Sequence, residues 1–97
     1  MQLTFHPSVA KDTLRIITHY EDLGGPNLAR EFHTELRATF LKALAAPLSY
    51  SARESGLHRA NLPRFPYHFL FRVVGNDVRI LVVRHHSRRP ALGTTRR

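Results

Sequence analysis

Apolar residues recur with two different periods along the chain, and the change of period predicts its elements. Residues 2–6 alternate weakly and are followed by Pro7, which predicts a short strand. A helical spacing begins at Pro7 or Ser8 and ends at Gly24, Gly25 and Pro26, since two glycines and a proline oppose helix continuation. The predicted apolar stripe of this helix comprises Ala10, Leu14, Ile17 and Tyr20, with Val9, Thr13 and Ile16 beside them.

A second helix is predicted from about residue 27 to residue 46. Asn27 is a candidate N-cap, and the helix ends before Pro47. One face of it carries an apolar residue at every fourth position: Leu28, Phe32, Leu36, Phe40 and Leu44. Because only a short turn joins the two helices, we expect them to form an antiparallel hairpin.

The second half of the chain has the period of strands. Residues 57–62, 67–74 and 78–85 are predicted strands, and Gly75-Asn76-Asp77 is a hairpin turn between the last two. The order β-α-α-β-β-β predicts an α+β domain, with the two-helix hairpin on one face of a mostly antiparallel four-stranded sheet. We take residues 1–97 as a single domain, with residues 91–97 as a frayed, flexible tail.

The last two strands are apolar on both of their faces. In the final strand, Val78, Ile80, Val82 and Arg84 are expected on one face, opposite Arg79, Leu81, Val83 and His85. One face lies under the helices. The other is then more apolar than a solvent-facing surface should be, which indicates that a partner covers it.

The net charge of +8 belongs to one half of the chain. Residues 1–50 have five basic and five acidic side chains, whereas residues 51–97 have ten arginines, no lysine and two acidic residues. Arginine pairs with carboxylates and phosphates in fixed geometry, so this asymmetry indicates an anionic partner, either nucleic acid or an acidic protein. A solvated basic surface would give the same composition.

Composition also excludes several classes of protein. Hydrophobic residues make up 42% of the chain, which is typical of a globular protein and not of a disordered one. No apolar run has the length of a membrane span, and we expect no secretory signal and a cytoplasmic location. The absence of cysteine excludes disulfides and thiolate metal sites.

Two sets of residues are candidates for chemistry or binding. His85 and His86, beside Arg88, are candidates for a general base next to phosphate-binding cations. We expect no metal site, because adjacent histidines on a strand point to opposite faces. The second set is a proposed binding patch for a partner or target: Arg59, Arg64, Arg72, Arg84 and Arg88.

The hairpin turn decides whether two arginines face one another. With Gly75-Asn76 as the loop, Arg72 and Arg79 lie directly opposite, which is unfavourable unless an anion is shared between them. With Asn76-Asp77 as the loop, they do not face each other.

Several local patterns, in this order and at this spacing, resemble the RelE/ParE toxin superfamily and most closely its ParE branch. The resemblance extends from about residue 3 to residue 90. It rests on Phe5-His6-Pro7 with Asp12, Ile17 and Tyr20, on Phe32 and Glu35-Leu36 leading to Pro47, on Arg59 with Arg64-Phe65-Pro66-Tyr67, and on the segment from Ile80 through His85-His86-Ser87-Arg88-Arg89 to Pro90.

The resemblance implies the toxin of a type II toxin–antitoxin pair. For the ParE branch it implies growth inhibition by binding DNA gyrase, neutralisation by an acidic ParD-like antitoxin in a hetero-oligomer, and no cofactor. The alternatives are a RelE-like ribosome-dependent mRNA endonuclease, a plain nucleic-acid-binding module, and a degenerate relative that binds antitoxin without toxicity. The chain lacks an aromatic residue after Pro90, a lysine after Lys42 and a tyrosine after Tyr67. These departures favour a binding protein over a ribonuclease.

Overall fold

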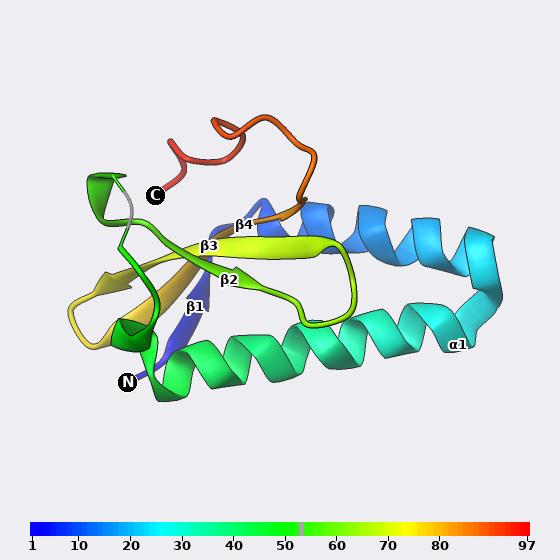
Figure 1. Cartoon of the computed structure of the whole chain (residues 1–97), viewed down its shortest axis with the longest axis horizontal. Helices are drawn as coiled ribbons and strands as arrows, with labels where there is room; N and C mark the ends of the chain where they lie inside the picture. Colours follow the sequence, from blue (N-terminus) through cyan, green and yellow to red (C-terminus); the bar gives the residue numbers. More distant parts are fainter. Residues whose placement is uncertain (53) are drawn as a thin grey trace.

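The computed structural model, which describes residues 1–52 and 54–97, has a helical hairpin on one face of a four-stranded sheet (Figure 1). The strands are β1 (Leu3–Phe5), β2 (His58–Asn61), β3 (Tyr67–Val74) and β4 (Asp77–His85), in the order β1-β4-β3-β2. β4 and β2 each pair antiparallel with β3, whereas β1 pairs parallel with β4. The sheet is therefore mixed but mostly antiparallel, and the predicted α+β class is confirmed.

The predicted pair of helices is a single element interrupted by one residue. Helix α1 extends over Val9–Ala45, and Gly25 within it has non-helical angles of φ 80° and ψ −176°. The chain reverses there, so α1 consists of two arms that run back along each other (Figure 1). Asn27 lies inside the second arm, where its side chain accepts a hydrogen bond from Arg30, and is not the predicted N-cap. Two short 3-10 turns, η1 (Pro47–Ser49) and η2 (Glu54–Gly56), connect α1 to β2.

The core lies between α1 and the sheet. Phe32, Leu36 and Phe40 of the second arm are buried there, as their spacing predicted. The first arm buries Tyr20 as predicted, but otherwise it is rotated relative to its predicted stripe, because it buries Val9, Asp12 and Ile16 in place of Ala10, Leu14 and Ile17. The side chain of Leu14 is consequently 64% exposed. The prediction for this arm was wrong because its apolar residues outnumber those that one helical face can hold.

A β-bulge in the β3–β4 ladder changes which residues of β4 face the helices. Leu70 pairs with Val82 and Phe71 with Ile80, so Leu81 has no partner on β3. Val82 consequently packs with Leu81 on the far side of the sheet, while Val83 joins the core under α1. The predicted alternation beyond Leu81 was therefore wrong by one position, because periodicity does not detect an inserted residue.

The far side of the sheet is covered by the chain itself. Residues 86–97 run back over β3 and β4 (Figure 1), and Arg84 donates hydrogen bonds to the carbonyl oxygens of Pro90 and Leu92 at 2.8 and 2.7 Å. A Cβ atom at Gly93 would lie 2.6 Å from Val82 Cβ, so this segment packs closely on the sheet. The expectation of an open apolar face was therefore wrong, because residues of the chain itself cover it. No helix of residues 1–52 and 54–97 is long and apolar enough to cross a membrane.

Candidate functional site

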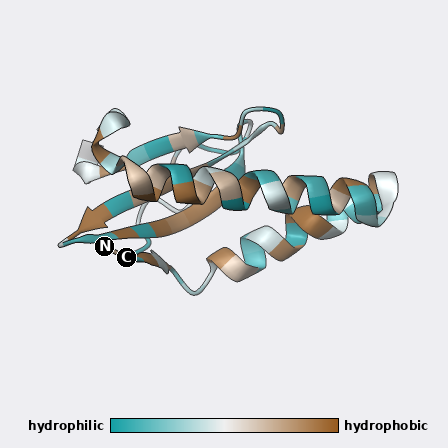
Figure 2. Ribbon diagram, turned by 90° about the horizontal axis from the view of Figure 1, so that it is seen from below, coloured by the Kyte–Doolittle hydropathy of each residue, from teal (hydrophilic) through white to brown (hydrophobic). Residues whose placement is uncertain are grey.

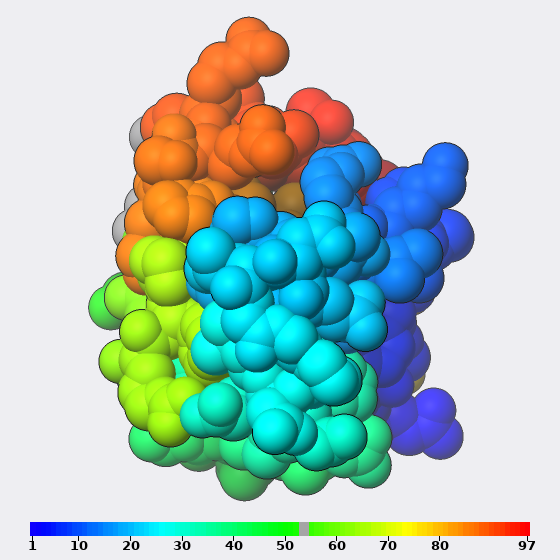
Figure 3. Space-filling model, turned by 90° about the vertical axis from the view of Figure 1, so that its right-hand side faces the viewer, coloured from blue at the N-terminus to red at the C-terminus, as the bar shows by residue number. Residues whose placement is uncertain are grey.

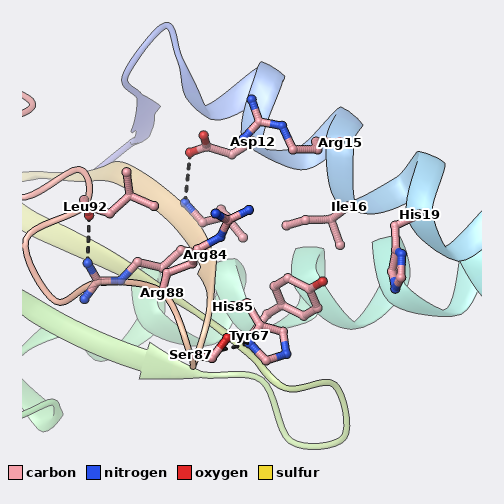
Figure 4. A pocket seen from close by; sticks show the side chains of 11 residues that line it. Asp12, Arg15, Ile16, His19, Tyr67, Arg84, His85, Ser87, Arg88 and Leu92 are labelled. Atoms are coloured by element: carbon pink, nitrogen blue, oxygen red, sulfur yellow. Dashed lines mark hydrogen bonds between the residues drawn. The ribbon is translucent and has the colours of Figure 1, made fainter.

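A basic hollow of about 640 Å³ opens where the first arm of α1 faces the end of β4 (Figure 4). Arg15 and His19 line it from α1, one helical turn apart. Tyr67, His85 and Arg88 line it from β3, β4 and the segment that follows β4. The hollow therefore combines three of the predicted candidates, Arg84, His85 and Arg88, with two basic residues that the analysis of the sequence did not select.

The one acidic side chain in the wall of this hollow is already paired. Asp12 is buried, and its carboxylate accepts hydrogen bonds from the Val83 backbone N–H at 3.1 Å and from Arg96 at 2.7 and 3.3 Å. This ion pair connects α1, β4 and the C-terminal segment. Arg96 compensates the charge of Asp12. The charges of Arg15 and Arg88 therefore keep the hollow basic and suited to an anionic partner.

His85 is held by the residue two positions further on. The Ser87 backbone N–H donates to His85 Nδ1 at 3.0 Å, and Ser87 Oγ lies 2.8 Å from the same nitrogen. A backbone N–H can only donate, so Nδ1 of His85 is an acceptor, and the ring proton lies on Nε2. His85 therefore presents an N–H donor to the hollow.

His86 belongs to a hydrogen-bonded chain on the other side of β4. Arg84 Nε donates to His68 Nε2 at 2.8 Å, which places the proton of His68 on Nδ1. His68 Nδ1 lies 2.9 Å from His86 Nδ1, and Arg59 approaches the same His86 nitrogen at 3.3 Å. The two rings are stacked. Partial desolvation, and then the charges of Arg59 and His85, lower the pKa of His86 below its usual value.

These bonds determine what the two histidines offer to a ligand. Both accept at Nδ1, so each neutral ring carries its proton on Nε2, the nitrogen left for a ligand. A general base needs an unprotonated nitrogen directed at the proton it removes. His85 and His86 are thus arranged to donate hydrogen bonds and not to accept a proton. The described residues also include no cluster of three or more histidine, aspartate or glutamate side chains suited to a metal ion.

The five predicted arginines do not form one continuous patch. Arg59, Arg72 and Arg84 extend from β2, β3 and β4 on the far side of the sheet, where Arg84 is buried and bonded to His68 and the C-terminal segment. Arg88 lies in the basic hollow that faces α1, which Arg84 also lines. Arg84 therefore lies between Arg88 and the arginines on the far side of the sheet. The one-patch prediction was wrong for the fifth, Arg64.

Arg64 lies in the β2–β3 connection and is paired with helix α1. Its guanidinium is 3.1 Å from Glu31 and 3.5 Å from Glu35, and Glu35 also accepts hydrogen bonds from the backbone N–H groups of Arg64 and Phe65. Arg64 thus fastens the connection to α1. The sequence offered a signal for this contact, because Glu31 and Glu35 occupy one face of the helix one turn apart.

An apolar groove that the pattern analysis missed lies along α1 beside β1. Phe5 and Leu14 line it with exposed fractions of 44% and 64%, together with Ile17 and Phe40. Leu41, half exposed, continues it toward the second arm. An apolar surface of this kind favours contact with another protein. The rotation of the first arm, which leaves Leu14 unburied, is the reason that this surface exists.

The fold and these surfaces define a small basic α+β protein with a basic hollow and an apolar groove, both of which are suited to binding. A family model described as "ParE toxin of type II toxin-antitoxin system, parDE" matches residues 3–90, and the chain belongs to this family. A solved structure described as "Chromosomal ParDE TA system from P. aeruginosa" is similar to it, with 26% sequence identity and a TM-score of 0.78. The match covers 88% of this chain and 95% of that chain. No curated protein matched.

Proposed function

We propose that this ParE-family toxin inhibits growth by binding DNA gyrase, without catalysis, until an acidic antitoxin neutralises it. The observation that carries the non-catalytic part is the hydrogen bonding of His85 and His86, both of which turn an N–H toward any ligand. RNA cleavage by a 2′-hydroxyl needs a base to activate that group. The arginines of the hollow, together with this arrangement of His85, favour binding an anionic surface over reacting with it.

The antitoxin is proposed to use two surfaces of different character. The acidic residues of the antitoxin contact Arg59, Arg72 and Arg88. Arg84 is buried and supports these three arginines from within the sheet. An amphipathic segment packs into the groove formed by Phe5 and Leu14. Such a segment folds as it binds, which is the usual behaviour of a flexible chain on a preformed apolar groove. The product is a hetero-oligomer of toxin and antitoxin.

Primer extension and gyrase assays separate this proposal from RNA cleavage. Induction of the toxin should raise the DNA-damage response and stabilise gyrase–DNA cleavage complexes in vitro, while ribosome-bound messages remain intact. The His85→Gln variant should keep this activity. Codon-phased cuts in messages that disappear in His85→Gln would establish a ribonuclease instead. Loss of both effects, with antitoxin binding retained, would identify a degenerate toxin.

A further inference from the structure

A second hollow, on the far side of the sheet, is lined by arginines and hydroxyl groups. It has a volume of about 730 Å³ and lies between β3 and the C-terminal segment. Its polar wall includes Ser55, Arg72, Arg84, Thr94, Thr95 and Arg97. Leu57 and Leu70 form an apolar floor. The three arginine side chains give the space an electrostatic potential that favours an anion.

The arrangement of Arg72 shows that the charge in this hollow is incompletely compensated. Val74 pairs with Asp77, so Gly75-Asn76 is the two-residue loop and Arg72 lies directly opposite Arg79. Like charges at facing positions of a sheet repel each other. Arg79 donates to the Arg97 main-chain oxygen at 2.9 Å, and Arg72 donates one Nη1 bond to the Ser55 carbonyl. The Ser55 carbonyl is neutral, so Arg72 gains no counter-charge from this bond.

Arg72 also has a donor that is left without a partner. Its Nε is buried, and no hydrogen-bond acceptor for it is found among the described residues. A buried donor without an acceptor is unfavourable by about 1–3 kcal/mol, so native structures rarely keep one. An oxyanion that contacts the Nε edge of the guanidinium would satisfy this donor and reduce the repulsion from Arg79.

We infer that this hollow is a binding site for a phosphate oxyanion, either inorganic phosphate or the phosphate of a small organic ester. Arginine side chains approach from the sheet and the hydroxyl of Thr95 from the C-terminal segment, whereas the Thr94 hydroxyl already donates to the Ala91 carbonyl. Donors from several directions suit the tetrahedral oxygens of phosphate better than the two oxygens of a planar carboxylate. The apolar floor leaves room for an organic group on an ester.

The site has a structural consequence, because one of its walls is the C-terminal segment. Pro90, Ala91 and Thr94 line the hollow together with Leu57 and Leu70 of the sheet side. A bound phosphate therefore contacts both walls and holds the segment against the sheet. A ligand that binds only the folded state raises the free energy of unfolding, and this gain grows as the ligand concentration rises above Kd.

Calorimetric titration of the isolated chain with inorganic phosphate tests the site. Sodium chloride at matched ionic strength corrects for general screening, and sodium acetate tests a carboxylate. Wild type should bind one phosphate per chain and gain thermal stability. The Arg72→Gln variant should bind about tenfold more weakly, equivalent to ~1.4 kcal/mol. Arg30→Gln, which removes the same charge from α1, should bind as wild type does.

Three results would overturn the inference: no saturable heat with phosphate, equal binding by Arg72→Gln, or acetate binding as tightly as phosphate. Should Arg72→Gln fail to fold by circular dichroism, Thr95→Val at the other wall replaces it. That variant should also weaken phosphate binding, and unchanged binding would count against the site. Neither antitoxin nor gyrase is present, so these outcomes are independent of the proposed function.

Discussion

Asp12 shows how much of the fold can depend on one side chain. Its position early in a helix suggested only a favourable interaction with the helix N-terminus. The structure buries it instead, bonded to the Val83 N–H and to Arg96. Periodicity had no means to predict this contact, because its partners lie 71 and 84 residues further along the chain.

Replacing Asp12 by asparagine should lower the free energy of unfolding by about 1–3 kcal/mol. The amide keeps the shape of the carboxylate but leaves the partly buried Arg96 guanidinium without its counter-charge. In a domain of this size, each kcal/mol corresponds to about 4–8 °C in Tm. Thermal unfolding of Asp12→Asn and of Asp22→Asn, an exposed aspartate on the same helix, measures the effect. Equal Tm values for the two variants would contradict the structural role of Asp12.

The pKa of His86 predicts a pH dependence of stability. Desolvation, Arg59 and His85 lower the pKa of His86, so the folded chain binds fewer protons than the unfolded chain below the ordinary histidine value of about 6.5. The contribution of His86 to stability is therefore present above that value and is lost as pH falls toward the lowered pKa. Urea unfolding at about pH 7 and pH 5.5 should show a smaller loss for His86→Gln than for wild type. His33→Gln, at an exposed position on α1, should match wild type, and an unchanged loss in His86→Gln would refute this assignment.

At the scale of elements, spacing predicted where strands lie better than which way their side chains point. The bounds of β3 and β4 agree with the predicted 67–74 and 78–85 to within one residue. The bulge at Leu81 then reverses the faces of Val82 and Val83. Both valines are apolar, so neither orientation leaves a polar residue in the core. The sequence therefore contains no penalty from which the bulge could have been inferred.

Gly25 is the residue that converts one helix into a hairpin. Its angles of φ 80° and ψ −176° belong to a region that only glycine occupies readily. Gly25→Ala should therefore lower the free energy of unfolding by about 1–3 kcal/mol, although nothing lies within 4 Å of the added Cβ. Gly24→Ala is the matched control. Its Cβ meets the flexible Leu28 side chain, and alanine improves helix propensity by about 1 kcal/mol, so the net change should be near zero. Equal losses in urea unfolding would contradict the assigned turn.

Gly93 performs the corresponding role in the C-terminal segment. Small and polar residues there predicted fraying, but Gly93 combines φ +80° with a close approach to Val82. An added Cβ would overlap the valine, so Gly93→Ala should release the segment from the sheet. Trypsin should then cleave after Arg88 faster than in wild type. Gly75→Ala is the matched control, because Gly75 has a similar φ of +60° but no atom within 4 Å of the added Cβ. Unchanged cleavage in Gly75→Ala would show that the steric overlap with Val82, and not backbone strain, releases the segment. Equal cleavage of both variants would argue against docking through Gly93.

At the scale of the whole molecule, the charge asymmetry predicted a basic surface but not its division. Ten arginines in the second half of the chain indicated an anionic partner. The structure shows that they serve different purposes: Arg96 compensates Asp12, Arg64 fastens a loop to α1, and Arg84 holds the C-terminal segment. Composition counts charges without their intramolecular partners. For that reason it overestimates the surface available to an antitoxin, which we propose to centre on Arg59, Arg72 and Arg88.

The charges at that surface should matter more to antitoxin binding than the same charges elsewhere. In the proposed complex, Arg59→Glu with Arg88→Glu places two negative charges against acidic antitoxin residues, one on the far side of the sheet and one in the basic hollow. The affinity should fall by more than the roughly 0.2–1 kcal/mol of an exposed ion pair. The affinity of this double variant for the antitoxin should also depend less on salt concentration, because fewer opposite charges meet at the interface. Arg30→Glu with Lys42→Glu changes the net charge equally on the second arm of α1 and should have little effect. Titration calorimetry with the purified antitoxin at low and high salt measures both quantities. An equal loss of affinity in the two double variants would show that net charge, and not the arginines at the sheet, recruits the antitoxin.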